Sequence, residues 1–255
     1  MNRAPVLPAL LAGLSLAAAG GLLAIGAEAQ QQPTQAGWPQ PVHNDPLLGY
    51  AVVNQNELRT GDGSSTYRWD AEGWYGDNLN SAWVKTEGNL DTGTSALDEA
   101  EAQLLYSRAV STFFDLQAGV REDFAPGPAR SWGAVGIEGL APLYWNIGAF
   151  AFVSDSEHLG ARLEGYYDLL LTQRLILQPQ FELNVYSRND PRREIGAGFS
   201  DLDTGLRLRY EIRRELAPYI GVTYENRYGH TAALTRGQGA PIEQVRLALG
   251  IRARL

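Results

Sequence analysis

The sequence has 255 residues, of which 29 are acidic and 21 are basic, and its formal net charge is −8 at pH 7. This acidic balance argues against a nucleic-acid partner, because phosphate binding needs a basic face. Cysteine is absent, which excludes a disulfide framework and a lipoprotein anchor. Beyond the N-terminal segment, no stretch approaches about 18 uninterrupted apolar residues, so helical membrane spans are excluded.

Residues 1–29 have the pattern of a secretory signal peptide. Arg3 precedes an apolar run rich in leucine and alanine, and Ala27-Glu28-Ala29 forms a small-x-small cleavage site. A membrane anchor is the alternative interpretation. Residues 30–45 are rich in glutamine and proline and poor in apolar residues, which predicts a disordered periplasmic tail. Residues 46–255 are then expected to form a single domain.

From about residue 50 onward, apolar and polar residues alternate in a series of stretches, as in β-strands. Most stretches have about ten or more residues, the length a tilted strand needs to cross the hydrocarbon layer, whereas soluble strands usually have about five or six. An even strand number is typical of bacterial single-chain barrels. The sequence thus predicts an all-β, 12-stranded antiparallel transmembrane β-barrel of the bacterial outer membrane, with strands at residues 50–59, 66–77, 80–89, 97–109, 112–123, 130–140, 143–154, 158–171, 174–188, 199–211, 217–227 and 242–255.

The stretch at residues 161–171 illustrates the two faces. Leu163 and Leu169 fall on one face, and Arg162 and Glu164 fall on the other. At residues 242–255, three arginines share one face while apolar residues occupy the opposite one. A soluble β-sandwich would place its apolar faces inside, so we expect the reverse arrangement, with apolar residues toward lipid.

The connections between the expected strands differ in length. Those near residues 77–79, 111, 141–142 and 172 are tight, the others are mostly longer, and the longest are 189–198 and 229–241. Barrels of this class have short periplasmic turns and longer extracellular loops. We therefore expect both termini in the periplasm.

Nearly all basic residues are arginine, and Lys85 is the only lysine. Arginines on the expected inner faces lie near acidic residues, with Arg162 beside Glu164 and Arg207 and Arg209 between Asp203 and Glu211. Planar guanidinium groups pair well with carboxylates across neighbouring strands. The lumen is therefore either narrowed by ion pairs or forms a selective ion path, in which inner-face acids could guide a cation or be structural: Glu72, Glu164, Asp168, Glu182 and Glu211.

Several runs carry a resemblance to a known family. They are QLLYSRA at residues 103–109, DLQAGVR at 115–121, DLLLTQRLILQP at 168–179 and GLRLRYEIRRE at 205–215, with DAEGW at 70–74 and LNSAWVKTEG at 79–88 nearer the start. From about residue 46 to the end, the sequence resembles the copper resistance protein B family of outer-membrane proteins.

This resemblance implies copper ion binding and a role in copper homeostasis and resistance. It also implies contact with outer-membrane lipid and work alongside periplasmic copper proteins, including a multicopper oxidase. The family commonly has a methionine- and histidine-rich segment before the barrel, whose soft ligands suit copper. This sequence departs from that pattern, since its only methionine is Met1 and its tail offers only His43.

Three histidines are available as metal ligands or catalytic bases. His158 follows Asp155 and Glu157 in an expected outer loop, and this trio is the candidate metal site, although a solvated loop tip is the alternative. His230 has no nearby ligand in the sequence. No serine lies at matching depth beside either loop histidine, and the Gly-x-Ser-x-Gly motif is absent, so we expect no enzyme. A narrow channel or structural barrel without metal binding is the alternative to the copper function.

Overall fold

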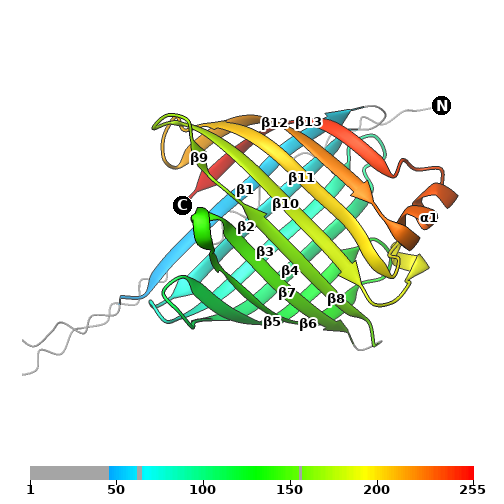
Figure 1. The fold of residues 1–255 in the computed structure, drawn as a ribbon, viewed down its shortest axis with the longest axis horizontal. Helices are drawn as coiled ribbons and strands as arrows, with labels where there is room; N and C mark the ends of the chain where they lie inside the picture. The colour runs from blue at the N-terminus through cyan, green and yellow to red at the C-terminus, as the bar shows by residue number, and fades with distance from the viewer. Residues whose placement is uncertain (1–45, 62–64, 155–156) are drawn as a thin grey trace, which may run out of the picture. The chain divides into compact units, whose positions relative to one another are not determined.

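A computed structural model describes residues 46–61, 65–154 and 157–255, and these form a closed antiparallel β-barrel (Figure 1). The expected signal peptide and tail at residues 1–45 lie outside the described residues. The strands are β1 Leu48–Gly61, β2 Thr66–Gly76, β3 Asn80–Asp91, β4 Leu97–Ala109, β5 Phe114–Ala125, β6 Arg130–Leu140, β7 Asn146–Ser154, β8 Leu159–Tyr166, β9 Leu169–Leu170, β10 Leu175–Tyr186, β11 Gly198–Tyr210, β12 Leu216–Arg227 and β13 Glu243–Arg254.

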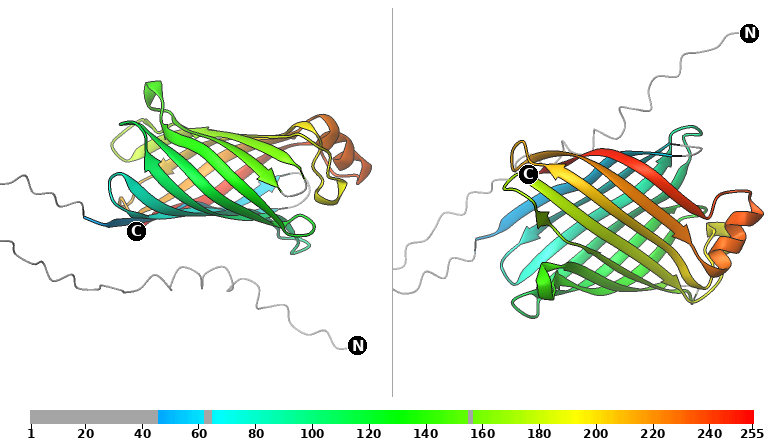
Figure 2. Two further views of the ribbon diagram at one scale, coloured as in Figure 1. Left: turned by 90° about the horizontal axis from the view of Figure 1, so that it is seen from below. Right: turned by 45° about the horizontal axis from the view of Figure 1, so that its top comes forward.

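The strands pair in chain order, and the pairing of β1 with β13 closes the ring. Strands β8 and β9 both pair with β10 on the same side, so they form one barrel strand that is interrupted at Tyr167 and Asp168. Counted in this way, the barrel has the twelve strands that the sequence predicts. Figure 2 shows that the strands are inclined to the barrel axis, as closure of a sheet into a barrel requires.

The two faces of the strands differ as the sequence predicts, with an apolar outside and a mainly polar inside. Leu249 and Leu104 are more than half exposed on the outside. Arg59 and Arg207 are almost fully buried inside. The two faces arise because successive side chains of a strand point to opposite sides of the sheet. An apolar exterior around a polar interior suits a lipid environment. Among the described residues, no helix is long and apolar enough to cross a bilayer.

Connection lengths follow the expected alternation only in part. The turns after β2, β4, β6, β9 and β11 are short, but the connections after β1, β3, β5 and β7 are equally short. Only the connections after β10 and β12 are long. We call the end of the barrel with these two connections the loop end, and the opposite end the turn end.

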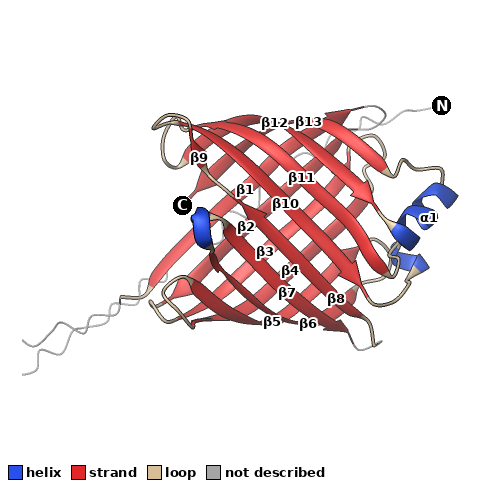
Figure 3. Cartoon of the chain, viewed as in Figure 1, coloured by secondary structure: helices blue, strands red, loops and turns tan. Residues whose placement is uncertain are grey.

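Local structure at the two ends differs from the sequence-based expectation. The expected loop at 229–241 contains the helix α1, Gly229–Gly237, which lies at the end of the barrel opposite the C-terminus (Figure 3). It packs on β11 and β12, and its own residues Thr231 and Thr235 are buried in this contact region. At the turn end, the 3-10 turn Pro142–Tyr144 takes up the start of the strand expected at 143, because Leu143 and Tyr144 adopt positive φ and cannot extend a strand.

Candidate functional site

Many charged side chains lie in the interior of the barrel, next to a buried apolar cluster that includes Phe150 and Phe152. Arg59, Arg207 and Arg209 are at most 1% exposed, as is Glu57. A charge in such a position is tolerated only if it is paired and hydrogen-bonded. The lumen is therefore the part of the molecule where charge and shape can act on a ligand.

Two cavities lie inside this lumen. The turn-end cavity has a volume of about 380 Å³ and reaches Thr112 and Leu140. The loop-end cavity has a volume of about 160 Å³ and reaches Pro126 and Thr231. Acidic side chains outnumber basic ones by more than two to one in the lining of each cavity. Both compartments are thus electrostatically suited to cations rather than anions.

A layer of ion pairs separates the two cavities, and we call it the neck. Three of its residues, Arg68, Glu101 and Glu182, line both cavities. Arg162 on β8 lies 3.0 and 2.9 Å from the two carboxylate oxygens of Glu101 on β4. Its Nε lies 3.2 Å from Glu182, and its Nη1 also donates to Glu87 on β3. The neck therefore joins non-neighbouring strands across the lumen.

Arg68 completes the neck from β2. Its Nη2 lies 3.0 Å from Glu87 and 3.3 Å from Glu182. The planar guanidinium group can donate to several carboxylates at once, which explains why arginine occupies these positions.

A second network lies on the wall that runs from β11 through β12 and β13 to β1. Arg59 lies 2.7 Å from each of Glu57, Asp203 and Glu225. Arg207 donates to both carboxylate oxygens of Glu57, at 2.9 and 2.7 Å. Gln55 accepts from both Arg59 and Arg68, so this network is linked to the neck.

Lys85, the only lysine in the sequence, projects into the turn-end cavity from β3. Its ammonium lies 2.5 Å from Glu138 and 4.0 Å from Glu72. It also lies 5.1 Å from the ring centroid of Phe150 and 5.4 Å from that of Trp83, which adds a cation–π attraction. The ammonium group of Lys85 is thus a fixed positive charge in this cavity, held between carboxylates and aromatic rings.

A glycine makes room for this aromatic wall. A Cβ atom on Gly136 would lie 2.2 Å from the ring of Phe150. Any larger residue there would push the ring away from the wall and disturb its contact with Lys85.

The arginines of the inner face pair with carboxylates, as the sequence suggests, but their main partners are mostly not the acids next to them in the sequence. Arg162 pairs with Glu87, Glu101 and Glu182 rather than with its sequence neighbour Glu164. Arg207 pairs with Glu57. Arg209 pairs with Asp168 at 3.0 Å and reaches Glu211 only at 4.0 Å. Most of these partners lie on strands that are not neighbours in the ring, and the pattern along one strand does not show which strands face each other across the lumen.

The structure places the inner-face acids named from the sequence in two groups. Glu72, Glu164 and Glu182 line the turn-end cavity. Asp168 and Glu211 instead lie near arginines at the turn end, within 4.0 Å of Arg252 and 3.9 Å of Arg254 respectively.

The loop trio suggested as a metal site is only partly described. Asp155 lies outside the described residues. Glu157 forms an exposed ion pair with Arg188 at 2.9 Å, and the carbonyl of His158 accepts the backbone N–H of Ser154. Metal binding by Asp155, Glu157 and His158 stays a prediction.

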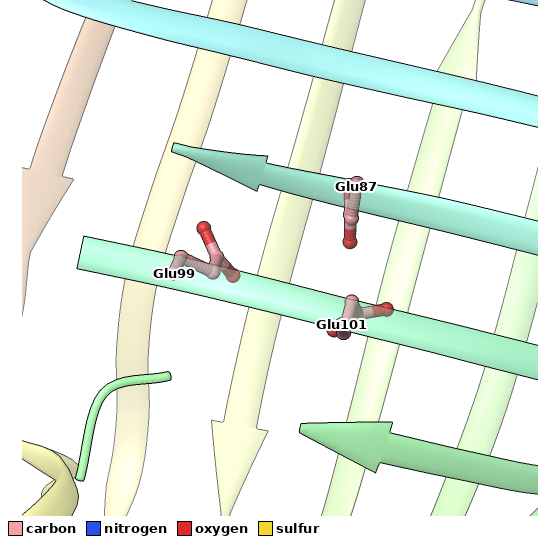
Figure 4. Close-up of side chains that lie close together, drawn as sticks. All are labelled: Glu87, Glu99 and Glu101. Carbon is pink, nitrogen blue, oxygen red and sulfur yellow. The ribbon is translucent and has the colours of Figure 1, made fainter. Parts of the chain in front are cut away.

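One acidic group in the neck was missed by the sequence analysis. Glu87, Glu99 and Glu101 each offer a carboxylate oxygen, and these oxygens lie within 4.8 Å of one another (Figure 4). Glu87 is directly opposite Glu101 across β3 and β4. Only the register of the β3–β4 hairpin, which the alternation of residues does not give, brings these carboxylates together.

The closed strand ring, apolar outer face and charged lumen define an outer-membrane β-barrel. A solved NanC porin structure has the same fold, with a TM-score of 0.54 and 15% identity, covering 82% of this chain and all of that chain. At this identity, the likeness concerns the fold alone.

The chain belongs to the copper resistance protein B family, as its sequence resemblance suggested. The family model described as "Copper resistance protein B precursor (CopB)" matches residues 47–255. Copper resistance protein B of Escherichia coli is 42% identical over 211 residues, which cover 83% of this chain and 71% of that protein. A Copper resistance protein B homolog of Pseudomonas syringae pv. tomato gives the same identity and coverage. Membership supports a role in copper resistance.

Proposed function

We propose that this outer-membrane barrel binds copper ions in its lumen and takes part in copper homeostasis. The observation that carries the proposal is the acidic lining of both cavities on either side of the neck. A cation that enters from one end meets a surplus of carboxylates, which lowers its electrostatic energy. Family membership supplies copper as the cation of interest.

The proposed orientation places the turn end and both chain termini in the periplasm. The long connections at 187–197 and 228–242 would then face the outside of the cell, as is usual in this class of barrel. The turn-end cavity, which is the larger one, would open toward the periplasm. Copper proteins of that compartment, including a multicopper oxidase, are the proposed partners, and lipid of the outer membrane surrounds the barrel.

We propose no catalytic role. His158 and His230 both lie outside the linings of the two cavities. The lumen carboxylates are held by arginines, and the role we assign to them is binding and passage of a cation.

Growth of a deletion strain in graded copper tests the proposed function. We expect the strain to be inhibited at copper concentrations that the parent tolerates, and the full chain to restore tolerance. Zinc tolerance serves as the control for a general envelope defect. A deletion strain that tolerates copper as well as its parent would overturn the proposal.

A narrow channel or structural barrel without metal binding is the second candidate. It is favoured by the ion pairs that close the neck, in which Arg162 and Arg68 already neutralise Glu87, Glu101 and Glu182. Under this alternative, copper tolerance would be unchanged by deletion. Permeability to small ions would fall on deletion of a channel and stay the same on deletion of a closed structural barrel.

A further inference from the structure

A row of carboxylates runs along the inner wall of the turn-end cavity. Strand register places Asp115 on β5 opposite Glu138 on β6. Gly148 on β7 lies between Glu138 and Glu164 on β8 in the same row. All of these residues line the turn-end cavity. Like charges in neighbouring cross-strand positions repel one another, so this row needs positive charge in front of it.

The protein supplies only one cation to this row. The ammonium group of Lys85 lies 2.5 Å from Glu138. In the described part of the chain, neither Asp115 nor Glu164 has a basic nitrogen within 4.0 Å. The two carboxylates on either side of Glu138 are therefore without an ion-pair partner, in contrast to those of the neck.

Gly148 leaves the room that the carboxylate of Glu164 occupies. A Cβ atom at this position would lie 2.7 Å from Oε1 of Glu164 and 3.2 Å from the ring of Phe150. The carboxylate thus lies beside the same ring whose centroid is 5.1 Å from the ammonium of Lys85. Carboxylate oxygens and an aromatic face both attract an ammonium group, and Lys85 shows that this wall accommodates one.

A buried amide next to the row has an oxygen without a hydrogen-bond partner. Gln117 on β5 is only 1% exposed and lines the turn-end cavity, and its Oε1 accepts no hydrogen bond from the described residues. It lies opposite Gly136, the glycine against which the ring of Phe150 packs. A buried amide oxygen normally finds a donor. An ammonium group, with its three N–H donors, would supply one.

The spacing of these groups fits an elongated organic cation better than a metal ion. Among the described residues, three carboxylates with oxygens within 4.8 Å of one another occur only in the neck. Neighbouring strands lie about 5 Å apart, so Glu138 and Glu164, which are two strands apart, offer separate points of charge.

The cavity also has the size and the apolar surface that such a cation needs. Its volume of about 380 Å³ falls in the range of sites for small organic molecules. Several apolar side chains in its lining suit a methylene chain: Phe113, Leu140, Ile147 and Phe181.

We propose that the turn-end cavity binds an aliphatic polyamine, with one ammonium group at Glu164 and another at Asp115, on either side of Lys85. This inference goes beyond the copper function and does not rest on it. The methylene segments lie against the apolar lining, and Gln117 accepts an N–H of the ligand beside Phe150.

Isothermal titration calorimetry of the full chain in nonionic detergent tests the site, with spermidine as the probe. Buffer treated with a chelating resin is free of metal, so copper takes no part. We expect one spermidine per chain. Its affinity should exceed that of n-butylamine by about tenfold or more, because the single ammonium of butylamine reaches one carboxylate only and forgoes a charge-assisted hydrogen bond.

The variant Glu164→Gln keeps the size of the side chain and breaks no ion pair of the protein, so the barrel should still assemble. We expect its affinity for spermidine to fall by about tenfold, the effect of losing one charge-assisted hydrogen bond. Glu99→Gln is the matched control, since Glu99 lines only the loop-end cavity, and it should bind as the parent does. Heat-modified migration on gels confirms that each variant is folded.

The variant Lys85→Met tests the row in the opposite direction. It removes the protein's own cation from Glu138, which then becomes available to the ligand. We expect spermidine to bind about tenfold more tightly, through one charge-assisted hydrogen bond gained. A gain in affinity cannot result from partial unfolding.

No saturable spermidine binding, equal affinities for spermidine and n-butylamine, or unchanged affinity in folded Glu164→Gln would each overturn the site. Weaker binding in Lys85→Met would overturn it as well. Failure of the proposed function is a separate result. A strain that depends on the protein for copper tolerance, while its purified barrel does not bind spermidine, would retain the copper function and lose the polyamine site.

Discussion

Arg162 and Glu101 face each other across the lumen and form two parallel hydrogen bonds of 3.0 and 2.9 Å. They come from β8 and β4, which are not neighbours in the ring. Their side chains are at most 3% exposed. One ion pair thus ties opposite walls of the barrel and forms part of the barrier between the two cavities.

Removing the acidic partner should destabilise the barrel. Glu101→Ala leaves Arg162 and Arg121 buried without their main acceptor, and breaking a buried pair in this way costs about 3–5 kcal/mol. Equilibrium unfolding in denaturant from detergent or liposomes measures the difference. Glu157→Ala, which breaks an exposed ion pair, should cost less than about 1 kcal/mol. Equal losses in the two variants would contradict the role assigned to Glu101.

Removing the basic partner should open the neck. Arg162→Ala takes away the group that holds Glu87, Glu101 and Glu182 together, and the carboxylates then repel one another. We expect a larger single-channel conductance in planar bilayers than for the parent protein. Arg188→Ala, in an exposed loop, is the control and should conduct like the parent. If Arg162→Ala also conducts like the parent protein, the neck is not the barrier to ion flow.

Lys85 should limit the cation preference of the turn-end cavity. Lys85→Met removes its ammonium and leaves Glu72 and Glu138 uncompensated. In Lys85→Met, the reversal potential across a potassium chloride gradient should move closer to the equilibrium potential of potassium. Lys85→Arg should keep the reversal potential of the parent protein. An unchanged potential in Lys85→Met would show that this cavity does not set selectivity.

The assignment of faces is tested by a pair of substitutions on β13. Leu249 is 55% exposed on the outer face, so Leu249→Arg should cost about 2–4 kcal/mol near the bilayer centre and impair assembly. Arg252 lies inside with its nearest carboxylate 4.0 Å away, so Arg252→Gln should be mild. Folding yield into lipid vesicles measures both, and equal tolerance would refute the assignment.

We expect Asp77, in the turn after β2, to make the stability of the protein depend on pH in the acid range. The backbone N–H groups of Leu79 and Asn80 donate to its carboxylate and hold the pKa of Asp77 below its usual range. A lowered folded-state pKa gives stability that is present above the unfolded-state pKa and is lost as the pH falls through the folded-state pKa. Asp77→Ala should therefore be less stable than the parent at neutral pH. The gap should close in strong acid, as measured by denaturant unfolding at both pH values.

The alternation of apolar and polar residues was enough to predict the strand number and the face of residues such as Leu249 and Arg252. Alternation has a period of two, so it identifies a face without identifying a neighbour. The opposition of Glu87 and Glu101 depends on the register of the β3–β4 hairpin, and an error of two residues in its bounds moves the pair. The neck group therefore could not be predicted from the pattern.

Helix α1 shows a second limit of the sequence. A nine-residue helix is marginal by itself in water, and its sequence has no strong apolar face. It is held by contacts from elsewhere, since Thr231 accepts the N–H of Gly196 and lies 3.0 Å from the hydroxyl of Ser200. Such tertiary contacts are not visible in a local pattern.

The seam of the barrel carries a consequence for the order of folding. Strand β1 pairs with β13, with Leu58 opposite Leu249, although the two strands lie at opposite ends of the barrel sequence. Until β13 is present, β1 and β12 each expose a free edge, which invites pairing with other chains. Residues 48–61 are synthesised first among the barrel strands, yet they gain their second neighbouring strand last. The chain therefore needs protection from self-association until it is inserted in the membrane.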